Sequence, residues 1–157
     1  QNGKALVMYN RFDNTNLQHL NIKNTRIYDL SGKLIMTIVV NFDGSNLQLH
    51  FQNNNKQRGL IEFISTIDIG KINTNVSVDY FSQNYSMIET IDIGFKGSEI
   101  VKKVYWKDKL IFHTKDAMSR KGETESFIKV DNDYLISNET EAGIWAIILH
   151  MCKELGK

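Results

Sequence analysis

Four histidines and one cysteine are the side chains of this chain most able to act as bases, nucleophiles or metal ligands. The histidines, His19, His50, His113 and His150, are far apart in the sequence and lack the short spacing of metal ligands. The sequence has no glycine-rich phosphate loop, no His-Glu-x-x-His, no Gly-x-Ser-x-Gly and no Cys-x-x-Cys. A hydrolase would need a site assembled by folding, with His50 or His113 as its base. The sequence therefore predicts no catalytic, metal or cofactor site, and a hydrolase is kept as an alternative.

Cys152 and His150 both fall inside an apolar block, residues 142–152. Cys152 is the only cysteine, so it forms no intramolecular disulfide, and its apolar surroundings predict a buried thiol. The ring of His150 would then need a hydrogen-bond partner inside the protein, such as a strand carbonyl.

The sequence Asp131-Asn132-Asp133 is similar to the start of a calcium loop, but Leu135 and Ile136 stand where a ligand and a glycine are required. We interpret that motif as a hairpin turn.

Positive charge is concentrated in one segment of the chain. Between Lys96 and Lys121 eight basic residues face three acids, which gives this segment +5 and leaves −4 for the rest, in agreement with the total of +1. A total so close to zero argues against nucleic-acid binding by bulk electrostatics. The segment is either a solvated lysine-rich face or a patch for anionic lipid headgroups or an acidic partner. The candidate residues are Lys102, Lys103, Lys107, Lys109, Arg120 and Lys121. Lys102 and Lys103 are adjacent on a predicted strand and must point to opposite faces, so only part of this set can share one surface.

About ten to twelve short strands are predicted before residue 139, because apolar runs recur between turn residues. They are Ala5–Tyr9, Arg26–Leu30, Lys33–Phe42, Leu47–Phe51, Leu60–Ile69, Ile72–Tyr80, Ser86–Phe95, Ile100–Trp106, Leu110–Thr114, Ser126–Val130 and Tyr134–Ser137. Residues 14–20 are compatible with a turn of helix, and residues 116–125 with a mobile surface loop or a binding edge. Many short strands before a single helix indicate a barrel or a strongly curved sheet.

A five-residue pattern, Thr-Ile-Asp-Ile-Gly, occurs at residues 66–70 and again at residues 90–94. In each copy the two isoleucines lie on one face of a strand and the aspartate on the other. Two copies do not establish a solenoid. We interpret them as equivalent strand ends and keep a metal-binding acid pair as the alternative.

The apolar block predicts a C-terminal helix over about residues 139–155. Asn138 or Thr140 can cap it, Glu139 and Glu141 suit the positive end of its dipole, and Lys153 suits the negative end. Apolar side chains cover every side of this helix except that of His150, so it is buried in protein or spans a membrane. Eleven residues rise only about 16 Å, roughly half of a bilayer core, which favours burial.

Three stretches of the sequence resemble the tubby C-terminal-like superfamily, which includes LURP-one-related proteins and phospholipid scramblases. The first is residues 27–35, IYDLSGKLI, similar to an early Asp-x-x-Gly-Lys hairpin of that family. The second is residues 104–112, VYWKDKLIF, similar to the hairpin before its final strands, and the third is Tyr134-Leu135-Ile136 followed by the apolar helix. The resemblance implies a single domain over residues 1–157, mostly β with a C-terminal helix, in which a closed barrel of about twelve strands surrounds that helix. This chain lacks a clear match to the basic phosphoinositide pocket of tubby proteins and to the cysteine-rich segment of scramblases.

A lipocalin-like barrel and a helix-grip fold are the alternative architectures. In both of them the helix packs on or beside the sheet and keeps one wet side, whereas the predicted helix here has none. A lipocalin also keeps its interior open for a ligand, which a central helix would fill.

The function favoured by these observations is a non-catalytic binding or scaffold domain, associated with anionic phospholipid or with a protein partner. The alternatives are a carrier of a small apolar ligand in a barrel cavity and the hydrolase already mentioned. No predicted helix is long enough to span a membrane. A cytoplasmic or membrane-peripheral location is favoured. Because the chain begins at Gln1, we expect a segment upstream, such as a signal peptide, an anchor or a flexible extension.

Overall fold

The computed structural model describes residues 4–44, 46–54, 56–63, 71–78 and 83–155. Ten strands in these residues form one antiparallel sheet, in which each strand pairs with the next along the chain. They are β1 (Met8–Asp13), β2 (Lys23–Tyr28), β3 (Leu34–Phe42), β4 (Leu47–Asn53), β5 (Lys56–Phe63), β6 (Lys71–Val78), β7 (Gln83–Gly94), β8 (Gly97–Trp106), β9 (Lys109–Ser119) and β10 (Thr124–Val130). The helical elements are η1 (Thr15–Leu20), α1 (Asn132–Ser137) and α2 (Glu139–Leu155). The chain is therefore mostly β with a C-terminal helix, as predicted.

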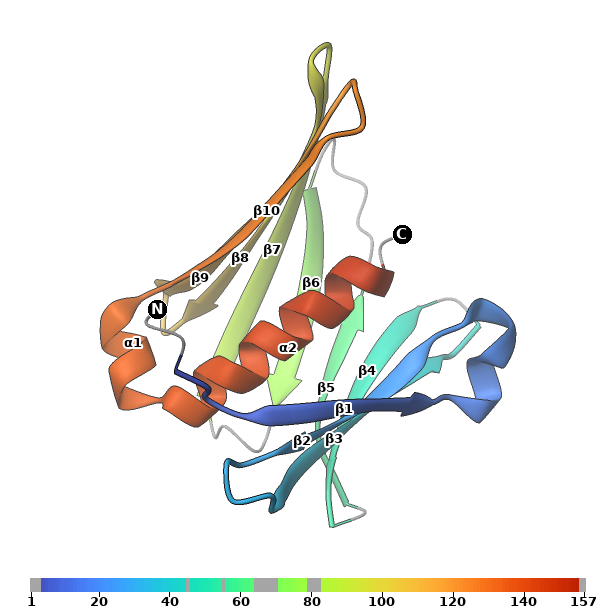
Figure 1. Cartoon of the computed structure of the whole chain (residues 1–157), viewed down its shortest axis with the longest axis vertical. Helices are drawn as coiled ribbons and strands as arrows, with labels where there is room; N and C mark the ends of the chain where they lie inside the picture. Colours follow the sequence, from blue (N-terminus) through green and yellow to red (C-terminus); the bar gives the residue numbers. More distant parts are fainter. Residues whose placement is uncertain (1–3, 45, 55, 64–70, 79–82, 156–157) are drawn as a thin grey trace.

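The sheet curves around α2, which crosses the hollow between its β1–β5 and β6–β10 halves (Figure 1). Alternation along the strands builds the core: Ile38 and Val40 of β3 and Leu49 and Phe51 of β4 are buried, with less buried residues between them. Trp145 of α2 is completely buried, and its ring centroid lies 5.1 Å from that of Tyr85 on β7 and 6.5 Å from that of Phe112 on β9. Burial of this apolar surface is the main term that holds helix and sheet together.

Helix α2 covers the predicted residues 139–155, but its outer side is partly exposed to solvent. Ala142, Ile144, Trp145, Ile148 and Cys152 are among its buried residues, whereas the side chain of His150 is 50% exposed and lies 3.4 Å from Glu154. The prediction that His150 needs a partner in the interior is therefore wrong.

The N-terminal segment passes over the outer side of α2 at Gly143. A Cβ atom at Gly143 would lie 2.9 Å from the side chain of Val7 and 3.1 Å from that of Leu6. Ion pairs extend this contact at both ends of the helix, from Lys4 to Glu139 and from Arg11 to Glu154. Glycine is required at this crossing because any side chain would displace the segment.

The predicted strand at residues 134–137 is wrong, because these residues belong to helix α1. Asp131 caps α1, and its carboxylate accepts a hydrogen bond of 2.9 Å from the Tyr134 backbone N–H. The motif at 131–133 is thus a helix start rather than a hairpin turn. The hydroxyl of Tyr134 and that of Tyr85 on β7 both donate to the Glu141 carboxylate, at 3.3 and 2.9 Å. This cluster fixes the beginning of α2 against α1 and the sheet.

A buried asparagine pair joins η1 to the sheet. Asn14 caps η1 by accepting from the backbone N–H groups of Asn16 and Leu17, and its amide donates to the Asn24 side chain at 3.0 Å and to the Val40 carbonyl at 2.7 Å. Asn24 in turn accepts from the Val40 N–H at 3.0 Å. The predicted turn of helix at 14–20 is confirmed, and its cap is a polar part of the core.

Two long hairpins, β7–β8 and β9–β10, extend beyond the C-terminal end of α2 and end side by side (Figure 1). Residues 116–125, predicted as a mobile loop or a binding edge, are the end of β9, a tight turn and the start of β10. Of the two Thr-Ile-Asp-Ile-Gly copies, residues 90–94 lie at the end of β7, and residues 66–70 lie outside the described residues.

Candidate functional site

The sheet separates the six residues of the predicted basic patch. Lys102 points into the hollow, is 5% exposed and pairs with Glu89 at 2.9 Å. Its neighbour Lys103 is partly exposed on the other face, as strand alternation requires. A single surface containing all six residues is therefore excluded.

The remaining four lie at opposite ends of the hairpins. Lys107 is in the β8–β9 turn and lies over the Trp106 ring, 4.8 Å from its centroid, and Lys109 begins β9 and lies 3.1 Å from Asp131. Arg120 and Lys121 occupy the β9–β10 turn at the other end of the strands. Arg120 and Lys121, unlike Lys107 and Lys109, belong to a larger cluster of apolar and charged side chains.

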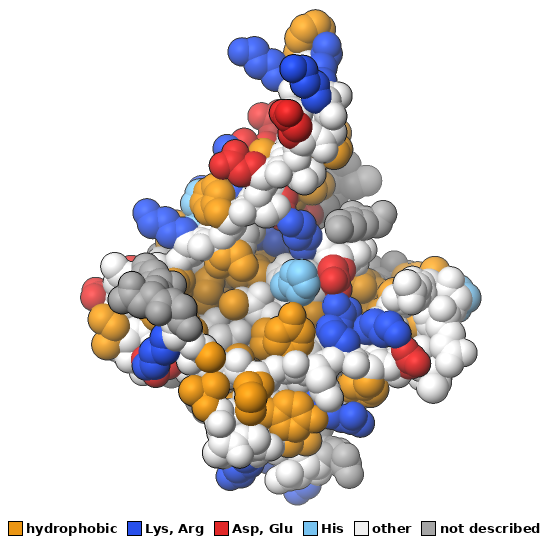
Figure 2. Space-filling model, in the orientation of Figure 1, with side chains coloured by type: hydrophobic (Ala, Val, Ile, Leu, Met, Phe, Trp, Pro, Cys, Tyr) orange, Lys and Arg blue, Asp and Glu red, His pale blue; other side chains and the backbone are white. Residues whose placement is uncertain are grey.

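We call that cluster the tip; it comprises residues 93–97 of the β7–β8 turn and residues 118–123 of the β9–β10 turn. Its large apolar side chains are exposed: Ile93 by 82%, Phe95 by 83% and Met118 by 49%. Three cations, Lys96, Arg120 and Lys121, stand against one acid, Glu123, so the tip carries a net charge of +2. Figure 2 shows Lys and Arg side chains around an apolar cap at the upper end of the molecule.

Contacts between the two turns hold the tip together. The guanidinium of Arg120 lies over the Phe95 ring, 3.8 Å from its centroid. Gly97 pairs with Ser119 and has a φ of +150°, and a Cβ atom there would overlap the Met118 carbonyl. The Ser119 hydroxyl accepts from the backbone N–H groups of Lys121 and Glu123 at 3.2 and 3.3 Å. The apolar and cationic side chains therefore project together from a well-defined backbone.

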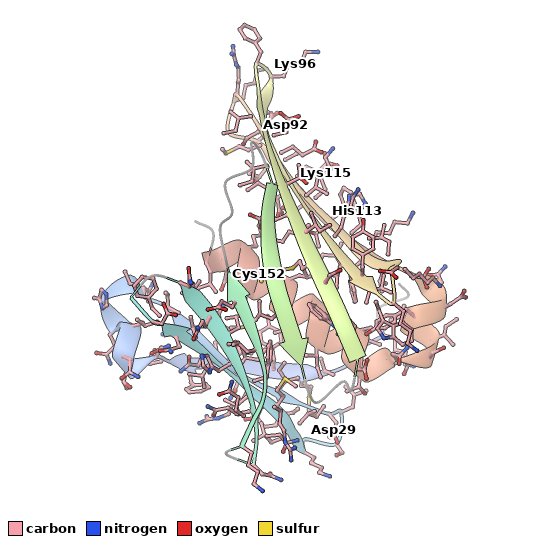
Figure 3. The ribbon with its side chains drawn as sticks, turned by 180° about the vertical axis from the view of Figure 1, so that it is seen from behind. Asp29, Asp92, Lys96, His113, Lys115 and Cys152 are labelled. Carbon is pink, nitrogen blue, oxygen red and sulfur yellow. The ribbon has the colours of Figure 1, made fainter. Side chains whose placement is uncertain are left out.

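Below the tip, the concave face of the hairpins continues toward α2. Ile91, Ile100 and Asp116 are adjacent across β7, β8 and β9, and Glu89, Lys102 and Thr114 form the next row. The C-terminal turn of α2 adds Cys152 and Lys153 to this face. Figure 3 shows Cys152 within the fold, Lys96 and Asp92 toward the tip, and Lys115 and His113 on the strands seen from behind.

Two groups on this concave face have shifted pKa values, the carboxyl of Asp116 and the thiol of Cys152. Burial alone would raise the pKa of Asp116, but a hydrogen bond with Ser126 and the nearby Lys153 ammonium outweigh it and lower this pKa. Lys153 lies 2.9 Å from Asp116 and donates to the Ser126 hydroxyl at 2.6 Å. Burial raises the pKa of Cys152 to about 12, against the opposing effect of Lys102. Cys152 is thus an inert thiol, as its apolar neighbours predicted.

His50 and His113, the candidate bases of a hydrolase, contact glutamine and phenylalanine side chains. The ring of His50 is hydrogen-bonded to the side chains of Gln48 and Gln57, at 2.8 and 3.3 Å. His113 packs edge-on against Phe127, with 5.9 Å between ring centroids. These contacts orient neither ring against a nucleophile, so they give the hydrolase alternative no support.

In the part of the chain that the structure describes, no helix combines the length and apolarity needed to cross a membrane. No group of three potential metal ligands from His, Cys, Asp or Glu is gathered within the described ranges. Comparisons with protein-family models, curated proteins and solved structures find no match to this chain.

Proposed function

We propose that this chain is a non-catalytic binding domain that attaches to anionic membrane surfaces through the tip. The observation that carries the proposal is the exposure of Ile93 and Phe95, each more than four-fifths exposed, beside Lys96, Arg120 and Lys121. Exposed apolar side chains of this size normally mark an interaction site when they gather in one place. Apolar groups that enter the headgroup region and cations that meet anionic lipids are the two contributions that hold a protein on a membrane surface.

The size of the tip favours a membrane over a protein partner. Residues 93–97 and 118–123 number five and six, eleven in all, at a narrow end of the molecule. A stable protein interface usually needs about 800 Å² and 20–30 residues on each side. A bilayer needs only a few inserted side chains, and each nearby cation adds about 1 kcal/mol.

Vesicle co-sedimentation tests the proposal with two variants of equal charge. One replaces the cations of the tip and the other replaces cations elsewhere on the surface. The tip variant is K96Q/R120Q/K121Q, and the control is K103Q/K107Q/K129Q. With vesicles of phosphatidylcholine and phosphatidylserine, the tip variant should bind about 100-fold more weakly than wild type, since three cations at about 1 kcal/mol each correspond to that factor. The control should lose much less.

Three results would contradict the proposal. One is equal binding of wild type to vesicles with and without phosphatidylserine. Another is equal loss in both triple variants, which would assign binding to net charge alone. The third is concentration-dependent self-association that requires the tip and is not accompanied by vesicle binding, which would make the tip a protein contact.

We also propose that a closed barrel of about twelve strands surrounds α2 and that the chain is related to the tubby C-terminal-like superfamily. The apolar inner surface of α2 and the passage of Leu6 and Val7 over Gly143 support these proposals. Among the described residues β1 and β10 are the edges of the sheet, and a groove of about 710 Å³ lies between Leu6 and β10. Closure would require a further strand pairing there. Hydrogen exchange tests it: a closed barrel protects the amides of β1 and β10 as well as those of β4, and rapid exchange along both edges would contradict it.

A further inference from the structure

A groove lies on the concave face below the tip, at the C-terminal end of α2. Its volume is about 230 Å³. Ile91, Ile100 and Met118 supply its apolar lining, and Lys102, Asp116 and Lys153 its main polar lining. A second groove of about 240 Å³ adjoins it, with Asp116, Ser126 and Lys153 lining both.

The charges of the groove neutralise each other. Lys102 pairs with Glu89 at 2.9 Å, and Lys153 pairs with Asp116 at the same distance. Both lysines and both acids line the same groove, so two positive and two negative charges sum to zero. A charged ligand would lose its hydration without gaining an opposite charge that is free to pair with it, and that loss is costly.

The row of Lys102 also contains a buried hydroxyl group. Thr114 lies directly across from Lys102 on β9 and is 5% exposed. Among the described residues, its buried hydroxyl oxygen has no hydrogen-bond partner, and Thr114 lines the adjoining groove. Buried hydroxyls in native proteins are normally paired, so this one is suited to hydrogen-bond a polar group of a ligand.

We propose that this groove binds a small uncharged amphiphile, an alkyl chain with a hydroxyl or amide end. The groove and the one that adjoins it, of about 230 and 240 Å³, leave room for a short alkyl chain. The alkyl chain would lie along Ile91, Ile100 and Met118, and the polar end would reach the row of Lys102 and Thr114. Of these three apolar residues only Met118 also belongs to the tip, and ligand binding in the groove requires no membrane.

Methyl NMR on the full chain tests this with three ligands of equal length, octan-1-ol, octanoate and octylamine, in the absence of vesicles. Octanol should shift the methyl signals of Ile91, Ile100 and Met118 in a saturable manner and leave those of Ile27 and Ile38 in the core unchanged. The two charged ligands should bind at least about tenfold more weakly, because their charge has no free partner in the groove. I100W, which fills the groove, should abolish the shifts, and V101W on the opposite face of the same strand should keep them.

The methyl shifts of the wild-type protein test ligand binding in the groove even if I100W fails to fold. Absence of saturable shifts up to the solubility limit of octanol would overturn the inference. Equal shifts at Ile27 and Ile38 would do so too, because they would indicate unspecific partition. Octanoate or octylamine that binds as tightly as octanol would show that the groove does not discriminate against charge, which contradicts the neutral ligand class. A protein that fails to bind vesicles but shows the expected shifts would refute the membrane proposal alone.

Discussion

Replacing Phe95 by alanine should weaken binding to anionic vesicles about tenfold. Phe95 is 83% exposed, so nearly all of its side chain is available to leave water when the tip enters the headgroup region. Full burial of such a side chain contributes about 1.5–3 kcal/mol, and 1.4 kcal/mol is a factor of ten in affinity. The lower end of this range applies because the Arg120 guanidinium, 3.8 Å from the ring centroid, already covers one face of the ring. The fold itself should lose only the cation–π contact, about 0.5–1 kcal/mol.

Titration of protein with phosphatidylserine-containing vesicles measures this effect, and the chain offers a matched control. Ile136 on α1 is 77% exposed and lies far from the tip in the fold. I136A should bind vesicles like wild type, and I93A should be weakened in the same sense as F95A. If F95A and I136A have the same affinity as wild type while their melting temperatures are unchanged, apolar insertion of the tip is refuted.

Four further predictions concern the rest of the fold. Trp145→Ala should cost about 3–5 kcal/mol in chemical denaturation, because the ring is completely buried against the sheet; a change below 1 kcal/mol would mean that α2 is not the core. Lys102→Ala should destabilise by about 1–3 kcal/mol by leaving the partly buried Glu89 without its partner, and K102M/E89L should recover most of that loss in the same assay. Asn14→Ala should lower stability by about 2–3 kcal/mol, since it removes a helix cap and leaves a buried carbonyl without its donor, whereas the exposed Asn10→Ala should be nearly neutral. Cys152 should resist alkylation at pH 9 in the native protein and react on unfolding, because burial raises its pKa in the folded state to about 12. For the same reason the native state should lose stability as the pH rises from 9 toward 12, and the melting temperature measures this loss.

The pattern of apolar residues along the sequence was sufficient to predict α2, β3 and β4. The apolar block with acids before it and a lysine after it predicts α2, and the structure gives the helix the same bounds. Apolar runs between turn residues predict β3 and β4, whose buried residues follow a period of two from Met36 onward. The strand predicted at 134–137 failed because a short apolar run has no period of its own, and the Asp131 cap decided in favour of a helix.

The tip could not be found in the sequence, since it depends on strand register. Phe95 and Arg120 are 25 positions apart and meet only because Gly97 pairs with Ser119. The same register sends Lys107 and Lys109 to the opposite end of the hairpins, which divides a segment that the charge count treats as one patch. The sequence places Ile93 and Phe95 in a predicted strand, residues 86–95, but it does not predict their exposure, because periodicity does not reveal how far a hairpin extends beyond the core.

The role of the buried asparagines could not be predicted from the sequence. Asn14 and Asn24 form a buried hydrogen-bonded unit with the backbone of Val40. Composition alone cannot distinguish such a pair from surface asparagines, because their role depends on a contact between η1, β2 and β3.

The position of the tip relative to a bilayer is the most direct test of the account. Cys152 is buried and inert, so an environment-sensitive dye can be attached selectively to a cysteine introduced by Phe95→Cys, with Lys107→Cys at the other end of the hairpins as the control. On addition of phosphatidylserine-containing vesicles, the dye at position 95 should shift to the blue and brighten, and the dye at position 107 should not change. An unchanged spectrum at position 95, or an equal shift at both positions, would contradict attachment through the tip.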